Sequence, residues 1–183
     1  MTARILTLIA LGATPTIVLA QDGATPARPA AGFAVASVRP LFEMSRNWLI
    51  KSAEQIPEAD FAFKPTPEVR SFGQLIGHLA NANYMFCSAA LGEKSPATQD
   101  FEKTTQKAAL VKAIKDALAY CDGAYQMTDE QAAGPAELPM ENMKGTKLWV
   151  LAFNVSHNNE HYGNLVTYFR LKGMTPPSSQ QGM

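Results

Sequence analysis

Apolar side chains recur at steps of three and four residues in four stretches of the chain, which is the spacing of one face of an α-helix. The stretches span about residues 38–55, 71–92, 104–126 and 146–171. No stretch shows the alternation of apolar and polar residues that is typical of a half-buried strand. The pattern therefore predicts an all-α fold, and four amphipathic helices of comparable length favour a four-helix bundle.

The first predicted helix carries apolar residues at Leu41, Met44, Trp48 and Leu49, which fall on one side at the helical spacing. We expect this side to enter the core. Pro57 follows the segment and ends the helix, because proline has no backbone N–H for the helical ladder.

The second predicted helix begins with a capping-box pattern. Ser71 precedes the segment and Gln74 stands three positions later, so each side chain can bond the backbone N–H of the other residue. Gly92 closes the segment, as is common at a helix C-terminus. The connections at residues 57–70 and 92–103 are long, which permits bundle topologies other than a simple up-down-up-down order.

The N-terminus is typical of a secretory signal peptide. Arg4 is followed by an uncharged apolar run to Ala20 that ends in Val-Leu-Ala, and polar residues come next. We therefore expect residues 1–20 to be cleaved near Ala20. This predicts a secreted or periplasmic protein with no stable membrane insertion after cleavage.

Two further segments lack helical periodicity. Residues 21–34 are rich in Ala, Pro and Gly and are predicted to form a flexible linker. Residues 175–183 are predicted to be a disordered tail. The folded part is accordingly expected to span residues 35–174 as a single domain.

The charge balance excludes one class of partner. Lysine plus arginine and aspartate plus glutamate number 16 each, and the sequence pI is about 6.8. Nucleic-acid-binding domains and anionic-membrane binders show a basic surplus, so neither partner is expected here.

The chain has only three histidines, and two of them, His157 and His161, stand four residues apart. Positions i and i+4 of a helix share a face, so both imidazoles can reach one metal ion. His78 on the second predicted helix can supply a third ligand. The alternative is that the pair lies on the surface and that His78 is a hydrogen-bonded core residue.

The same stretch matches H-x-x-E-H, the inverted signature of zinc proteases, with Glu160 as the general base. The usual third ligand of that site is a carboxylate further along the chain. No aspartate or glutamate follows His161, which excludes this usual third ligand. Glu160 can still activate a water or orient a ligand, or it can be a solvated helix residue.

The stretches "PEVRSFGQLIGHLANANYMFC" and "SHNNEHYGNLVTYFRLKGMTPPSS" resemble the DinB superfamily of small metal-binding four-helix bundles. The family pattern has one histidine on the second helix and an H-x-x-x-H pair on the fourth. The closing G-x-x-P-P-S also agrees with it, and the resemblance covers about residues 35–178. The resemblance implies that His78, His157 and His161 are the ligands of a divalent metal ion. Zinc is the first expectation, and nickel, iron, copper and manganese stay open.

The resemblance further implies an up-down-down-up bundle with long crossover connections, often assembled as a homodimer. In that topology the second and third helices run parallel, so Cys87 and Cys121 would lie at nearly the same height. Together with export to an oxidising compartment, this predicts a disulfide between them. Two buried free thiols, or thiolate ligation of the metal, are the alternatives.

Three functions stay open. A divalent ion with three protein ligands keeps one position for water or substrate, and characterised members of the family include thiol-dependent transferases; we therefore expect a hydrolase or thiol group transferase acting on a small molecule. Asn81, Tyr84, Asn158 and Tyr162 are candidates to line the pocket, and Glu160 is the candidate base. The alternative is a non-catalytic bundle that binds a metal or small ligand, and a helical interaction module without metal is a third.

Overall fold

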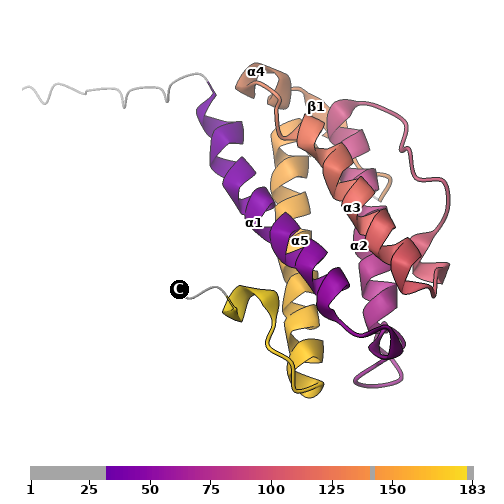
Figure 1. Ribbon diagram of the computed structural model, residues 1–183. Helices are drawn as coiled ribbons and strands as arrows, with labels where there is room; N and C mark the ends of the chain where they lie inside the picture. The colour runs from indigo at the N-terminus through magenta and orange to yellow at the C-terminus, as the bar shows by residue number, and fades with distance from the viewer. Residues whose placement is uncertain (1–31, 141–142, 181–183) are drawn as a thin grey trace, which may run out of the picture.

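The computed structural model describes residues 32–140 and 143–180. Four long helices make up most of this part of the chain and lie side by side (Figure 1): α1 (Phe33–Gln55), α2 (Phe72–Leu91), α3 (Lys107–Ala124) and α5 (Lys147–Leu171). The predicted all-α fold is confirmed. The predicted signal peptide, and the predicted linker up to residue 31, lie outside the described residues.

Shorter elements connect the long helices. The two long connections contain the 3-10 turns η1 (Glu58–Asp60) and η2 (Phe101–Lys103). Between α3 and α5 come α4 (Asp129–Ala132) and an antiparallel hairpin of β1 (Pro135–Glu137) with β2 (Lys144–Thr146). The sequence did not predict this hairpin, because three-residue strands are too short to show an alternating pattern.

Helices α2 and α3 run parallel. Near their first turns, the Cα of Gly73 faces the side chain of Leu110, and near their last turns Cys87 is bonded to Cys121. A parallel pair requires the connection between them, the crossover at residues 92–106, to travel back along the whole bundle. This crossover passes over one side of α2 (Figure 1).

Helices α1 and α5 also run parallel, in the direction opposite to α2 and α3. Trp48 of α1 stacks on Tyr162 of α5, with ring centroids 4.9 Å apart. At its C-terminal end, α1 meets the segment after α5, where the Gln55 side chain donates to the carbonyl of Thr175. The antiparallel contact of α5 with α2 brings Phe72 and Phe169 together, 5.6 Å between centroids. None of the described helices is both long and apolar enough to cross a membrane.

The predicted inner face of α1 was wrong in part. Leu49 is fully buried, but Leu41 and Met44 are 47% and 39% exposed. The buried face instead carries large apolar residues every seven positions, with buried serines between them: Val35, Phe42, Leu49 and Ile56, with Ser45 and Ser52. Ser45 donates its hydroxyl to the carbonyl of Phe42, which removes most of the cost of its burial, whereas the buried hydroxyl of Ser52 has no hydrogen-bond partner among the described residues.

The start and end of α2 agree with the sequence. Ser71 Oγ accepts from the N–H of Gln74, and Gln74 Oε1 accepts from the N–H of Ser71, so the capping box is formed in both directions. Gly92 ends the helix with φ of 76°, a left-handed conformation that glycine adopts without a Cβ clash. These local signals fix where α2 begins and ends.

The C-terminal tail was predicted to be disordered from residue 175, and this was wrong for residues 175–180. They form the 3-10 turn η3 (Pro177–Ser179), with Pro177 buried and the Ser178 N–H donating to the hydroxyl of Tyr162. The two prolines of this segment restrict the backbone and help the tail to pack on the bundle. Residues 181–183 lie outside the described part.

Asp129, the first residue of α4, caps the start of α1 from a distance. Its carboxylate accepts hydrogen bonds from the backbone N–H groups of Gly32, Ala34 and Val35, at 3.1, 2.9 and 3.0 Å. Backbone hydrogen bonds, first those from Val35 and Ala34, lower the pKa of Asp129 from its ordinary value of 3.8. The predicted start of the folded part at residue 35 was therefore slightly late, because α1 begins at Phe33 with a cap supplied by another segment.

We expect Asp129→Asn to loosen the first turn of α1, because the amide cannot accept with the same charge-assisted strength. Amide hydrogen exchange at Ala34 and Val35 should become faster at neutral pH. In the unchanged protein the protection should be present above the ordinary aspartate pKa and be lost as the pH falls through the lowered pKa of Asp129. Asp116→Asn, which alters a surface pair with Lys112, should leave exchange at these two amides unchanged.

The predicted disulfide between Cys87 and Cys121 is confirmed. The two Cα atoms lie 5.2 Å apart, and both residues are fully buried between α2 and α3. Free thiols and thiolate ligation of a metal are thereby excluded as the role of these cysteines. The bond joins the two parallel helices near their C-terminal ends.

A double Cys87→Ala, Cys121→Ala variant should lower the free energy of unfolding by about 2–4 kcal/mol, because the unfolded chain is no longer constrained. Urea unfolding with and without a reducing agent measures this. The reductant should destabilise the unchanged protein by a similar amount and have no effect on the double variant. Equal stability of the variant and the unchanged protein in the absence of reductant would contradict the expectation.

Candidate metal centre

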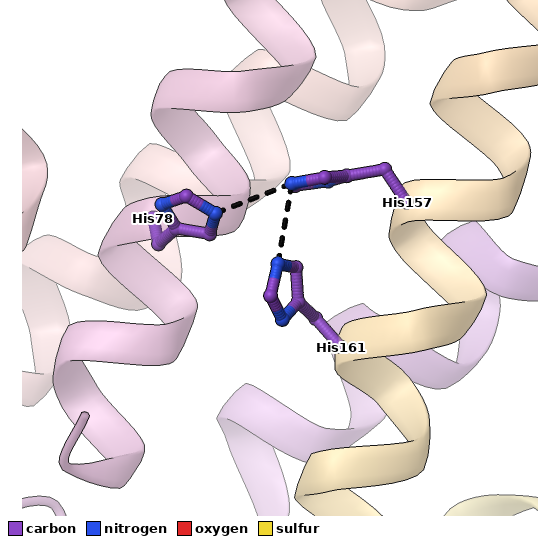
Figure 2. A group of neighbouring side chains, drawn as sticks. All are labelled: His78, His157 and His161. Carbon is purple, nitrogen blue, oxygen red and sulfur yellow. Dashed lines mark hydrogen bonds between the residues drawn. The ribbon is translucent and has the colours of Figure 1, made fainter. Parts of the chain in front are cut away.

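Three imidazole rings meet between α2 and α5 (Figure 2). His78 comes from α2, and His157 and His161 come from consecutive turns of α5. The Nε2 atom of His157 lies 3.2 Å from the Nε2 atoms of both other rings. One nitrogen of each ring lies within 4.8 Å of the others, so the set could hold a metal ion.

The spacing of these nitrogens fits a metal site. Two imidazole nitrogens bound to one tetrahedral zinc ion at 2.0–2.1 Å are about 3.3 Å apart. The observed separations of 3.2 Å are close to that value. Nitrogen lone pairs that converge without a proton between them repel one another, and a cation at the common point removes this repulsion.

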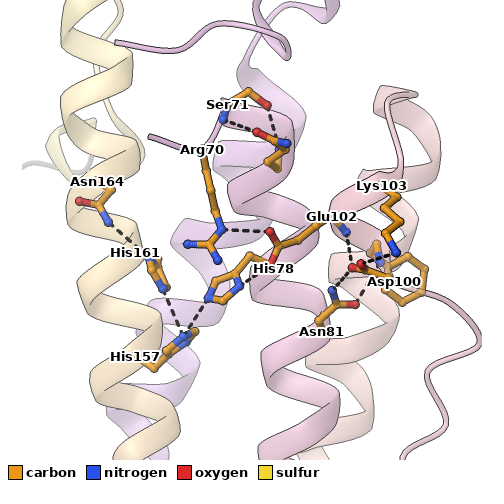
Figure 3. Close-up of polar contacts among 12 residues, drawn as sticks. Arg70, Ser71, His78, Asn81, Asp100, Glu102, Lys103, His157, His161 and Asn164 are labelled. Atoms are coloured by element: carbon orange, nitrogen blue, oxygen red, sulfur yellow. Dashed lines mark hydrogen bonds and ion pairs between the residues drawn. The ribbon is translucent and has the colours of Figure 1, made fainter. Parts of the chain in front are cut away.

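Glu102 fixes the orientation of His78. The Nδ1–H of His78 donates to Glu102 Oε1 at 2.7 Å, because a carboxylate can only accept, and this leaves the lone pair of the neutral ring on Nε2. The Nε–H of Arg70 donates to Glu102 Oε2 at 3.0 Å (Figure 3). A carboxylate behind a histidine is the usual support of a metal-binding imidazole. Burial by itself would raise the pKa of Glu102, but hydrogen bonds from Arg70 and His78 outweigh it and the pKa is lowered.

The two rings on α5 are held in the neutral form. Burial, and then the neighbouring charges of His161 and His78, lower the pKa of His157 to about 3. Burial also lowers the pKa of His161, whose Nδ1 lies 3.2 Å from the side-chain amide of Asn164. Metal ions bind neutral imidazole, so protons compete weakly for this pair. His157 has no hydrogen bond of this kind to fix its ring, because its buried Nδ1 has no partner among the described residues.

The crossover carries Glu102 to the site, and Gly77 permits this. The backbone of Phe101 in η2 lies so close to Gly77 that a Cβ there would overlap the carbonyl of Phe101. Asn81, one turn further on, accepts from the N–H of Phe101 at 3.1 Å and donates to Asp100 at 2.8 Å. The crossover is thus fixed on α2 directly beside His78.

The other predicted pocket residues contact partners other than the three rings. Tyr84 packs between Phe101 and Tyr120. Asn158 is fully buried and exchanges hydrogen bonds with Asn83.

Tyr162 stacks on Trp48 and accepts from the N–H of Ser178. Glu160 is exposed on α5, and its side chain makes no hydrogen bond or ion pair within the described chain. Asn81 acts on the site indirectly, because its hydrogen bonds hold the crossover that positions Glu102.

An open cleft of about 810 Å³ adjoins the rings at His161. Its polar wall includes six residues from the first connection, α2, the crossover and α5: Lys64, Arg70, Gln74, Glu102, His161 and Asn164. The sequence did not identify Arg70, Glu102 or Asn164 as site residues. Asn164 had a signal, since it stands one turn after His161, whereas Arg70 and Glu102 lie in connections whose path the sequence does not reveal.

A sequence profile of the DinB superfamily matches residues 41–165, a span that contains all three histidines. The chain belongs to the DinB superfamily. This superfamily is metal-associated, and the three histidines can hold an ion.

Solved structures of DinB-like proteins share the fold. The chain superposes on a DinB-like protein of Bacillus cereus with a TM-score of 0.67 at 14% sequence identity, covering 78% of this chain and 95% of that one. A DinB-like protein of Bacillus subtilis gives a TM-score of 0.57 at 24% identity, covering 76% and 94%. No curated protein matches the chain.

Gly77→Ala should destabilise this DinB domain by about 1–3 kcal/mol, because the added methyl forces the backbone of the crossover away from α2. Gly163→Ala on α5 is the matched control, since a Cβ added there would meet nothing within 4 Å. The control should gain about 0.5–1 kcal/mol from its better helix propensity. Urea unfolding of both variants measures this, and equal effects would contradict the role given to Gly77.

Proposed function

We propose that this DinB protein is an exported metalloprotein in which His78, His157 and His161 hold one divalent ion, zinc first, for hydrolysis or thiol group transfer on a small molecule. The observation that carries the proposal is the convergence of the three Nε2 atoms at a spacing suited to one ion. Nickel, iron, copper and manganese are the alternative ions.

Three protein ligands leave a tetrahedral ion one open position. The ring of His161 lines the cleft, so a small molecule in the cleft has access to the site from that side. A divalent ion bound there would act as a Lewis acid and lower the pKa of a water or thiol. Three neutral imidazoles do not offset the charge of the ion, and the Glu102 carboxylate stays one ring away, on Nδ1 of His78.

Two features support export. The N-terminal sequence is typical of a signal peptide with cleavage near Ala20. The buried Cys87–Cys121 disulfide is of the kind that persists in oxidising compartments.

A non-catalytic metal- or ligand-binding bundle is the competing function, and one observation favours it. Glu160, the predicted general base, is exposed and bonded to no residue of the site within the described chain. A metal site that the predicted base does not contact suits storage or sensing as well as turnover.

Elemental analysis after loading with one equivalent of zinc tests the ligand set. The unchanged protein should retain about one equivalent, and His78→Ala, His157→Ala and His161→Ala should each fall to background because a two-histidine remnant binds poorly. Glu160→Gln is the control and should retain zinc. Undiminished zinc in the three alanine variants would exclude the proposed centre.

Turnover separates the two functions. Ester, amide and thiol-adduct substrates should be converted by the zinc-loaded protein and not by His157→Ala. If zinc binds and no substrate of the three classes is converted, the non-catalytic function is supported. Loss of turnover in Glu160→Gln with zinc retained would assign Glu160 as the base.

A further inference from the structure

The guanidinium of Arg70 lines the cleft and is held in place, but some of its hydrogen-bond donors have no partner within the described chain. Arg70 is fixed at its backbone, where its carbonyl accepts from the hydroxyl of Tyr168 at 2.6 Å, and at Nε, which donates to Glu102. Its two terminal amino groups donate to no atom in the part of the chain that the structure describes. Figure 3 shows the guanidinium reaching from the start of α2 toward the histidines.

We propose that the cleft beside His161 binds a small organic acid, whose carboxylate is held by the terminal amino groups of Arg70. An arginine that is anchored through Nε keeps a planar pair of donors facing outward, and this pair matches the two oxygens of a carboxylate. Because the anchoring contacts are already made, little side-chain freedom is lost when the acid binds.

The charges around the cleft favour an anion over a cation. Lys64 lies on the same cleft and is exposed, as Glu68 is, so solvent screens both charges, and the terminal amino groups of Arg70 are the donors that favour an anion. Two carboxylates also line the cleft. Glu102 is already engaged by Arg70 and His78, and Glu68 lies fully exposed at the rim, where solvent screens it.

The volume and the lining of the cleft suit an acid with a hydrocarbon chain. Its volume of about 810 Å³ lies in the range of small-molecule sites. Apolar atoms of Pro65, Val69 and Leu75 form part of the wall, and Val69 is 39% exposed to the cleft side and solvent. An alkyl or aryl chain of a few carbons can cover this surface.

That this acid is the substrate presented to the metal centre rests on the proposed function. The carboxylate would be held at Arg70, so the far part of the same molecule would lie toward His161. Binding of the acid at Arg70 does not need the ion and can be tested without it.

Calorimetric titration of the metal-stripped full-length protein with hexanoate and with hexanamide, near pH 8, tests the binding. The two probes share a hydrocarbon chain and differ in charge. Hexanoate should bind at least about tenfold more tightly, because charge-assisted bidentate hydrogen bonds are lost in the amide. Arg70→Gln should reduce hexanoate affinity to the level of hexanamide. Arg46→Gln, which breaks an arginine–carboxylate pair with Asp122 on another face, is the matched control and should change nothing.

Glu102→Gln gives a second variant, which acts on the metal centre. The same change weakens the support of His78 and should lower zinc affinity by roughly 10–100-fold. Helical circular dichroism and the thermal midpoint show whether the two variants remain folded.

Equal affinity for hexanoate and hexanamide, or hexanoate binding that survives Arg70→Gln in a folded protein, would overturn the proposal. Zinc retention is measured on the same samples and keeps the two claims apart. Arg70-dependent hexanoate binding without zinc retention would leave the acid site standing and remove the metal centre. Zinc retention without a preference for hexanoate would leave the metal centre standing and remove the acid site.

Discussion

The close approach of three other elements to α2 is the constraint on which this structure depends. At Gly73 the side chain of Leu110 from α3 and residue Phe61 of the first connection lie close to α2, and at Gly77 the backbone of the crossover does. Cys87 of α2 is bonded to α3, and His78 and Asn83 of α2 contact α5. Because α2 is surrounded in this way, the three rings and Glu102 are placed by elements that cannot shift independently.

The register of α5 on α2 is set by buried amides close to the metal centre. Asn83 and Asn158, both fully buried, donate to one another's side-chain oxygens at 2.9 and 3.2 Å. Asn158 directly follows His157 in the chain, so a slip of one turn would break both hydrogen bonds and separate the rings. A lost pair of buried amide hydrogen bonds is costly, since each group would be left unsatisfied. These buried amides therefore help to fix the position of His157 relative to His78.

The sequence predicted those parts of the structure that depend on local pattern. Periodicity located the four helices, the Ser71–Gln74 pair located the start of α2, and the i, i+4 spacing of His157 and His161 indicated a shared face. The arrangement of His78 against the pair came from the family resemblance, because no local pattern fixes which helices are neighbours.

The errors and omissions have physical reasons. The inner face of α1 was misjudged because serines occupy buried positions there, and a prediction based on apolar residues followed Leu41 and Met44 instead. Glu102 and Arg70 were missed because both lie in connections, where the position of a side chain depends on how the chain crosses the bundle. The packing of Pro177 shows the same limit, since composition alone does not tell whether a surface exists to receive a segment.

The disulfide has one more consequence, which concerns proteolysis. The crossover between α2 and α3 is largely exposed from Gly92 to Asp100 and is a natural place for peptide-bond cleavage. Cys87 precedes this segment and Cys121 follows it, so the two fragments of a nicked chain remain covalently joined. Such a molecule would migrate as one species until reduced, and Glu102, which lies beyond the exposed stretch, would stay tethered beside His78.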